Sequence, residues 1–133
     1  MRQRLVALLL AGLIAAACAA PGSAGTTIEL DAADSGSSVP ASVGTSIVIA
    51  LEANPTTGYT WQLQPGLDES VVRFVSEDYQ QDPSGYGAVG AGGVDTLTFE
   101  AVGEGSTTIV LGYQRSGDPA PTDSFTVSVE VDG

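Results

Sequence analysis

An all-β domain is predicted by three features of the 133-residue sequence. Apolar and polar residues alternate over short segments at regular spacing, as expected of half-buried strands. No stretch of the domain carries the helical period of apolar residues. The composition, with 17 Gly, 7 Pro and 43% hydrophobic residues, is rich in turn formers yet apolar enough for a packed core. Together these features predict an immunoglobulin-like β-sandwich of about seven strands with Greek-key connections.

The first strand is expected at residues 26–30 and the fourth at 71–79, with a loop over residues 34–38. The apolar faces of the other five strands are Ile47, Ile49 and Leu51; Tyr59, Trp61 and Leu63; Leu97, Phe99 and Ala101; Ile109, Leu111 and Tyr113; and Phe125, Val127, Val129 and Val131. Each buried aliphatic or Phe side chain contributes roughly 1.5–3 kcal/mol, so a domain of this size is expected to fold without disulfides. Trp61 is expected in the core, because it shares a face with its neighbours on that strand.

The connections between these strands are unevenly distributed. If consecutive strands alternate in direction, residues 54–58, 81–93 and 115–121 all lie at one pole of the sandwich. The other pole receives tight turns near residues 64–66 and 103–105. Distinctive loops gathered at one end of a rigid scaffold are typical of a surface that binds another protein.

The N-terminus has the features of an export signal. A positively charged start, residues 1–4, precedes an apolar stretch, residues 5–16, that is shorter than the about 20 residues needed to span a bilayer. The end of this stretch, Ala15-Ala16-Ala17-Cys18, resembles the lipobox of bacterial lipoproteins, with Ala15 where Leu is usual. We therefore expect a signal peptide at residues 1–17, lipidation of Cys18, a flexible tether at 18–25 and the folded domain at 26–133.

This reading predicts an exported bacterial lipoprotein, anchored to a membrane on its periplasmic or cell-surface side. The alternative is cleavage at an ordinary Ala-x-Ala site, which leaves Cys18 in the discarded leader or as an unmodified thiol.

Charge and residue content exclude several functions. The chain has 16 acidic residues against 4 Arg and no Lys, a net charge of −12. Such a surface repels nucleic acid and favours a basic partner. His is absent and Cys occurs once, so no Ser–His or Cys–His nucleophile and no His/Cys zinc site can form.

The acidic residues also do not form a recognisable metal site or a recognisable active site built from carboxylates. The acids Glu77, Asp78 and Asp82 lack the count and spacing of a calcium loop. A glycosidase acting through two carboxylates is the enzyme alternative, but no two acids form a recognisable pair. We expect no metal, no cofactor and no enzyme activity.

One segment, Asn54-Pro55-Thr56-Thr57-Gly58-Tyr59, stands out in its chemistry. Pro55 restricts φ, Thr56 and Thr57 are stiff at χ1, and Gly58 supplies a backbone conformation that other residues resist. The segment predicts a short, stiff loop that projects two hydroxyls. From loop chemistry alone, the alternative is a well-made turn without function.

This segment, followed by Trp61, resembles the signature of the chagasin-like inhibitors of papain-type cysteine peptidases. That family has an immunoglobulin-like sandwich with three inhibitory loops at one pole. Its second motif, Gly-x-Gly-Gly, is matched by Gly90-Ala91-Gly92-Gly93. Its third motif is Arg-Pro-Trp after a Tyr-bearing strand. Arg115 matches the start of this motif, but Ser116 and Gly117 replace the Pro and Trp.

The resemblance implies a protein inhibitor, expected to be a monomer, that blocks the cleft of a papain-like peptidase. The first loop would enter the cleft with Thr56 or Thr57 near the catalytic thiolate and imidazolium. The residues 90–93 would lie along one side, pairing through bare backbone, and Arg115 would cover the other. The missing Trp predicts weaker inhibition or another target preference, since a buried aromatic anchor is worth about 2 kcal/mol or more. The alternative is a structural or adhesion module that kept the scaffold and lost inhibition.

Overall fold

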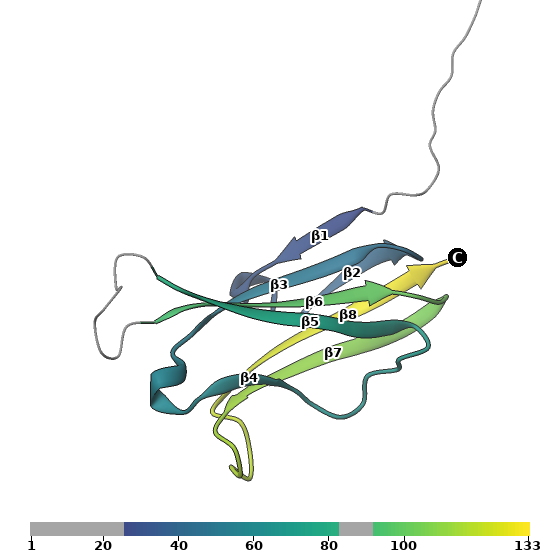
Figure 1. Cartoon of the computed structure of the whole chain (residues 1–133). Coiled ribbons are helices and arrows are strands. Elements are labelled where there is room, and N and C mark those ends of the chain that lie inside the picture. The colour runs from purple at the N-terminus through teal and green to yellow at the C-terminus, as the bar shows by residue number, and fades with distance from the viewer. Residues whose placement is uncertain (1–25, 83–91) are drawn as a thin grey trace, which may run out of the picture.

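The structure is a computed structural model that describes residues 26–82 and 92–133, and these form a sandwich of two four-stranded sheets (Figure 1). One sheet has the order β1 (Thr27–Leu30), β3 (Ser46–Ala53), β6 (Gly93–Ala101) and β5 (Val72–Gln81). The other has the order β2 (Ser37–Ser42), β8 (Asp123–Asp132), β7 (Gly105–Gln114) and β4 (Thr60–Leu63). Strands β1 and β3 are parallel, as are β2 and β8, and the other pairs are antiparallel. The predicted immunoglobulin-like all-β class is confirmed.

The N-terminal strand is divided between the two sheets, so the described residues contain eight strands where about seven were expected. The short 3₁₀ turn η1 (Ala32–Asp34) carries the chain from one sheet to the other. The expectation of a loop over residues 34–38 was wrong in its second half, because Ser37 begins β2. Strand β2 lies at a sheet edge and buries only Ala41, so its small and polar residues show no clear alternation.

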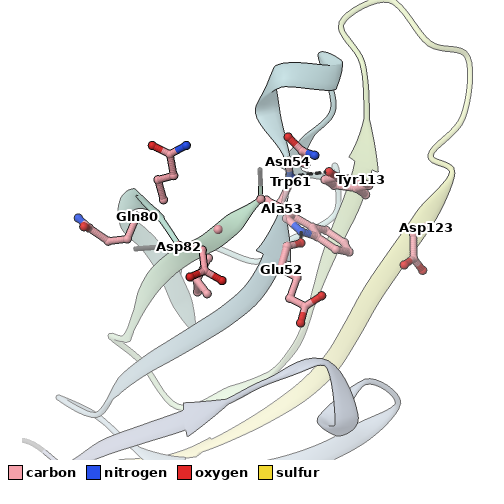
Figure 2. Close-up of a pocket in the computed structure, with 12 residues that line it drawn as sticks. Glu52, Ala53, Asn54, Trp61, Gln80, Asp82, Tyr113 and Asp123 are labelled. Atoms are coloured by element: carbon pink, nitrogen blue, oxygen red, sulfur yellow. Dashed lines mark hydrogen bonds between the residues drawn. The ribbon is translucent and has the colours of Figure 1, made fainter. Parts of the chain in front are cut away.

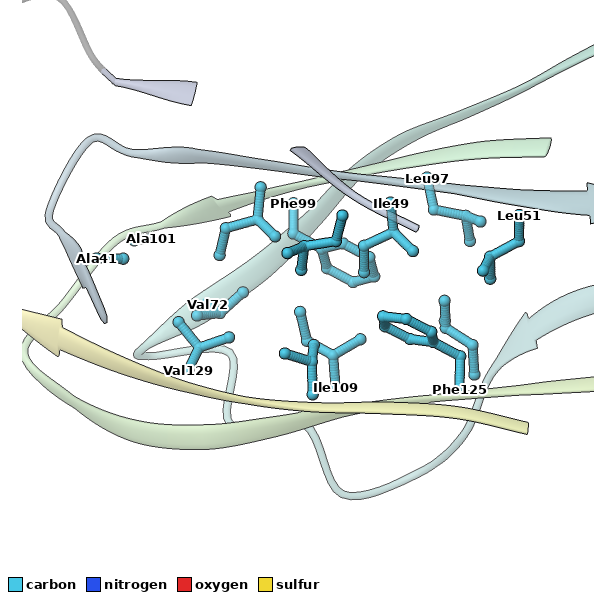
Figure 3. Packing of buried hydrophobic residues seen from close by; sticks show 14 of the residues in the cluster. Ala41, Ile49, Leu51, Val72, Leu97, Phe99, Ala101, Ile109, Phe125 and Val129 are labelled. Carbon is cyan, nitrogen blue, oxygen red and sulfur yellow. The ribbon is translucent and has the colours of Figure 1, made fainter. Parts of the chain in front are cut away.

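The core lies between the inner faces of the two sheets (Figure 3). Its largest fully buried side chains are Phe99, Phe125, Ile47, Ile49, Leu97, Ile109, Leu111, Val72, Val127 and Val129. These are the inward positions that the alternation predicts, because successive side chains of a strand point to opposite faces. Trp61 is 7% exposed and belongs to this core, as expected.

The β3–β4 and β7–β8 connections leave one pole of the sandwich, at the left and bottom of Figure 1, where β5 also ends and β6 begins. Strand β3 ends there at Ala53, which pairs with Gly93, and β7 ends there at Gln114, which pairs with Thr60. The residue Thr27 pairs with Ser46 at the start of β3, so the chain enters the domain from the opposite pole. We call these two ends the loop pole and the entry pole.

The β4–β5 connection is longer than the tight turn expected at residues 64–66. Strand β4 ends at Leu63, and the chain then continues to the entry pole before β5 begins at Val72. On this path the backbone N–H of Asp68 donates a hydrogen bond to the hydroxyl of Thr107 on β7 (2.8 Å).

Candidate functional site

The first loop has a fixed backbone shape. A single 3₁₀ turn, η2 (Pro55–Thr57), follows Asn54, and the N–H of Thr57 donates to the Asn54 carbonyl (3.1 Å). The N–H of Gly58 donates to the Pro55 carbonyl (2.8 Å). Gly58 closes the turn at φ 88°, in the left-handed region that favours glycine. The residues of the motif therefore form the short, stiff turn that their chemistry predicts.

The two threonine hydroxyls of this loop point back to Asn54. Thr56 Oγ1 donates to Asn54 Oδ1 (2.6 Å), and Thr57 Oγ1 donates to the Asn54 carbonyl (2.7 Å). Both threonines are exposed. A hydroxyl has one proton and two lone pairs, so each oxygen still offers acceptor capacity to a partner. The loop was expected to project two hydroxyls, and the structure shows that it presents them as acceptors.

A column of aromatic rings connects the first loop to the third. The rings of Tyr59 and Tyr113 are stacked with centroids 5.4 Å apart, and Trp61 lies 5.0 Å from Tyr113 on the other strand of the pair. The Tyr113 hydroxyl also accepts a hydrogen bond from the backbone N–H of Asn54 (2.9 Å; Figure 2). Both ends of the first loop therefore contact Tyr113.

Arg115, at the start of the third loop, covers the end of this column. Its guanidinium lies 5.0 Å from the centroid of the Tyr59 ring. Asp118 accepts the backbone N–H of Arg115 (2.8 Å), and its carboxylate lies 3.8 Å from Arg115 Nε. A Cβ added at Gly58 would lie 3.4 Å from the Arg115 side chain. The first and third loops are thus in contact, as the expected clustering requires.

The second loop reaches the same pole through Gly92 and Gly93, while Gly90 and Ala91 lie outside the described residues. A Cβ added at Gly92 would lie 3.2 Å from the Ala53 carbonyl oxygen, next to the first loop. At Gly93 it would overlap the carbonyl oxygen of Gln80. Glycine is required here because the backbones of β3, β5 and β6 approach closely.

A hollow of about 660 Å³ opens at the loop pole, lined by residues at the ends of strands from both sheets (Figure 2). Trp61 and Tyr113 contribute to its wall, and the carboxylates of Glu52, Asp82 and Asp123 line it. None of the described residues that line it is basic. This part of the loop pole therefore favours cationic groups on a partner.

One buried carboxyl group lies beneath this pole. Asp95 is 3% exposed, and its Oδ1 has no hydrogen-bond partner among the described residues. Burial, a hydrogen bond to Glu77 and the charges of Glu77 and Asp78 raise the pKa of Asp95 to about 8. Asp95 is therefore mostly protonated at neutral pH.

The described residues show neither a cluster of metal ligands nor a membrane-spanning helix. Within residues 26–82 and 92–133, no group of three or more His, Cys, Asp or Glu side chains is arranged to hold a metal ion. The same ranges contain no helix with the length and apolar character needed to cross a membrane.

Comparison with known proteins identifies the family. Residues 40–129 match the family model described as chagasin family peptidase inhibitor I42. The chain belongs to the chagasin family. Its members are peptidase inhibitors rather than enzymes, which agrees with the expected absence of enzyme activity.

Two relatives and one solved structure, all from protozoa, are similar to this chain. Amoebiasin-1 of Entamoeba histolytica is 35% identical over 86 residues, which is 62% of this chain and 78% of the relative. Chagasin of Trypanosoma cruzi is 29% identical over 103 residues, covering 74% of this chain and 93% of the relative. The crystal structure of a cysteine protease inhibitor from Entamoeba histolytica superposes with a TM-score of 0.73 at 26% identity, covering 84% of this chain and all of that one.

The sequence did not indicate the role of Tyr113, which was expected on the apolar face of its strand and at the start of the third motif. The alternation placed Tyr59, Trp61 and Tyr113 on the apolar faces of two strands, but the pairing of Tyr113 with Trp61 became visible only in the register of the structure. The hydrogen bond between Tyr113 and Asn54 has no sequence signal, since the two residues are 59 positions apart.

Proposed function

We propose that this chagasin-family chain is an exported inhibitor of papain-like cysteine peptidases. The observation that carries the proposal is the convergence of three elements at the loop pole: residues 54–58, the pair Gly92–Gly93 and Arg115. Arg115 packs on the ring of Tyr59 at the end of the first loop, and Gly92 lies close to Ala53 at its start. A solved relative of the same fold is described as a cysteine protease inhibitor, which supports a peptidase of this class as the target.

The shape of the first loop explains how it would block the cleft without being cleaved. A peptidase of this class hydrolyses a chain that lies extended across its active site, whereas η2 holds Pro55–Thr57 in a 3₁₀ turn. The hydroxyl oxygens of Thr56 and Thr57 would accept hydrogen bonds from the catalytic imidazolium. Because the loop is already ordered, docking it costs little conformational entropy.

The flanking elements would widen the contact on both sides. Gly92 and Gly93, together with Gly90 and Ala91, would pair with the peptidase through their backbone, as an added strand does. Arg115 would lie on the opposite side of the first loop. The carboxylates around the hollow would favour target peptidases with basic residues beside the cleft.

Titration of papain and of a cathepsin-type peptidase with purified residues 19–133 tests this function. The Thr57→Ala variant should inhibit at least tenfold less well, because it loses the hydroxyl that binds the Asn54 carbonyl. The matched control is Thr108→Ala, an exposed threonine on β7 towards the entry pole, which should inhibit like the wild type. Absence of inhibition by the wild type at micromolar concentration would contradict the proposal and favour a structural or adhesion module.

We also propose that residues 1–17 are a signal peptide removed before Cys18, that Cys18 is lipidated, and that residues 18–25 tether the domain of residues 26–133 to a bacterial membrane. The entry of the chain at the pole opposite the loops supports this arrangement, because an anchor there leaves the loops directed away from the membrane. Expression in a bacterium, fractionation and mass analysis of the mature N-terminus test it. The wild type should carry acyl chains and sediment with membranes, and Cys18→Ser should not. A mature wild-type N-terminus without acyl chains would instead support simple secretion.

A further inference from the structure

Tyr113 lies on β7 at the start of the third motif, and both ends of the first loop converge on it. At the start of the loop, the backbone N–H of Asn54 donates to its hydroxyl (2.9 Å). At the end of the loop, the Tyr59 ring stacks on its ring (5.4 Å). The residue itself belongs to the regular ladder of β7, where it pairs with Trp61 on one side and Asp123 on the other.

The strand pairing explains why the loop depends on this side chain. The β3–β6 ladder ends at the Ala53–Gly93 pair, so Asn54 is the first residue of the chain that leaves the sheet. At this point the Tyr113 hydroxyl accepts a hydrogen bond from the backbone N–H of Asn54. This bond continues the hydrogen bonding of β3 by one residue beyond the sheet. The hydroxyl is held in place because the phenol ring lies against both Tyr59 and Trp61. One side chain of the rigid second sheet thus fixes a loop that continues from the first sheet.

We propose that Tyr113 is a positioning residue that holds the first loop in its inhibitory orientation, through the hydroxyl bond at Asn54 and the stack at Tyr59. This proposal rests on the proposed inhibition of papain-like peptidases. Tyr113 acts on the target through the loop.

Removal of the hydroxyl alone separates positioning from packing. Tyr113→Phe keeps the ring and its stack but removes the acceptor of the Asn54 N–H. The first loop then samples other orientations. The apparent affinity falls in proportion to the fraction of molecules that remain in the orientation competent for binding. Since a hydrogen bond of this kind is worth at most about one tenfold step in an equilibrium constant, inhibition should weaken severalfold, up to about tenfold.

The matched control is Thr107→Val, on the same strand at the entry pole. This variant also removes a hydroxyl that accepts a backbone N–H, that of Asp68 (2.8 Å), and keeps the side-chain shape. Three quantities are measured for both variants and the wild type: the inhibition constant against papain, the melting temperature, and the hydrogen-exchange rate of the Asn54 amide by NMR. Tyr113→Phe should weaken inhibition and accelerate exchange at Asn54, whereas Thr107→Val should lower the melting temperature at least as much and change neither.

Two results would overturn the proposal. One is wild-type inhibition and wild-type Asn54 exchange in Tyr113→Phe. The other is equal weakening in the two variants, which would show a general effect of stability. If the wild type does not inhibit, the proposed function fails, and the exchange rate at Asn54 still decides whether Tyr113 holds the loop.

Discussion

The guanidinium of Arg115 lies over the ring of Tyr59, 5.0 Å from its centroid, and joins the third loop to the end of the first. In the family motif this arginine is followed by Pro and Trp, which Ser116 and Gly117 replace here. Both replacing residues are exposed. The third loop therefore keeps the arginine of the motif, packed against Tyr59, and has no aromatic side chain at the next two positions.

Arg115→Met should weaken inhibition several-fold and reduce stability only slightly. The variant keeps an unbranched side chain against Tyr59 but loses the cation, and an exposed cation–π contact is worth about 0.5–1 kcal/mol. Titration of papain and thermal unfolding measure the two effects. Arg73→Met is the control, because Arg73 pairs with Glu100 on an exposed sheet face. Equal inhibition by the two variants would show that Arg115 does not contribute to the inhibitory surface.

Gly58→Ala should impair inhibition through the backbone of the first loop. Gly58 has φ 88°, where an L-residue costs about 1–2 kcal/mol, and its new Cβ would lie 3.4 Å from Arg115. The matched control is Gly44→Ala at φ 97°, in the turn between β2 and β3 at the entry pole, where a Cβ has no atom within 4 Å. Urea unfolding should show similar destabilisation in both, and only Gly58→Ala should raise the inhibition constant. Wild-type inhibition by Gly58→Ala would indicate that the loop tolerates a change at its closing residue.

Asp95 should make the domain less stable as pH rises from about 4 to about 8. In the folded state burial and the neighbouring acids raise its pKa to about 8, from 3.8 for the unperturbed group. Between these values the folded state holds a proton that the unfolded state has lost, so stability falls by up to about 1.4 kcal/mol per pH unit.

The Asp95→Asn variant should remove this dependence, because the amide is neutral at every pH, and should be more stable than the wild type at pH 7. Urea midpoints at several pH values between 4 and 8 measure the slope. Parallel slopes for variant and wild type would show that Asp95 is not the titrating group.

Trp61→Phe should destabilise the domain by about 1–3 kcal/mol, since it leaves a partly buried carbonyl without this donor and removes part of a packed ring. In the wild type, Trp61 Nε1 donates to the Glu52 carbonyl (3.0 Å), and the side chain is 7% exposed. Chemical unfolding monitored by far-UV circular dichroism measures the change. An unchanged unfolding midpoint would contradict the assignment of Trp61 to the core.

The strands were predictable where apolar and polar residues alternate strongly and the apolar residues are buried in the core. The residues Phe125, Val127, Val129 and Val131 are buried as expected, because period-two alternation is the geometry of a strand itself. Strand β2 was missed because an edge strand with one buried residue, Ala41, has little apolar signal. Asp95 lies on the same inward face of β6 as Leu97 and Phe99. Its burial was not predicted, because an acidic residue in the sequence is expected outside the run of apolar positions.

The amino-acid sequence by itself determined the sandwich, the collection of three loops at one pole and the stiffness of residues 54–58, because these follow from local periodicity and backbone restriction. Only the tertiary structure decided that both threonine hydroxyls donate to Asn54, that Arg115 packs on Tyr59, and that Tyr113 holds both ends of the first loop. The physical reason is that side-chain rotamers and cross-strand register determine these contacts. Residues 59 positions apart meet only once both sheets have formed and packed against each other.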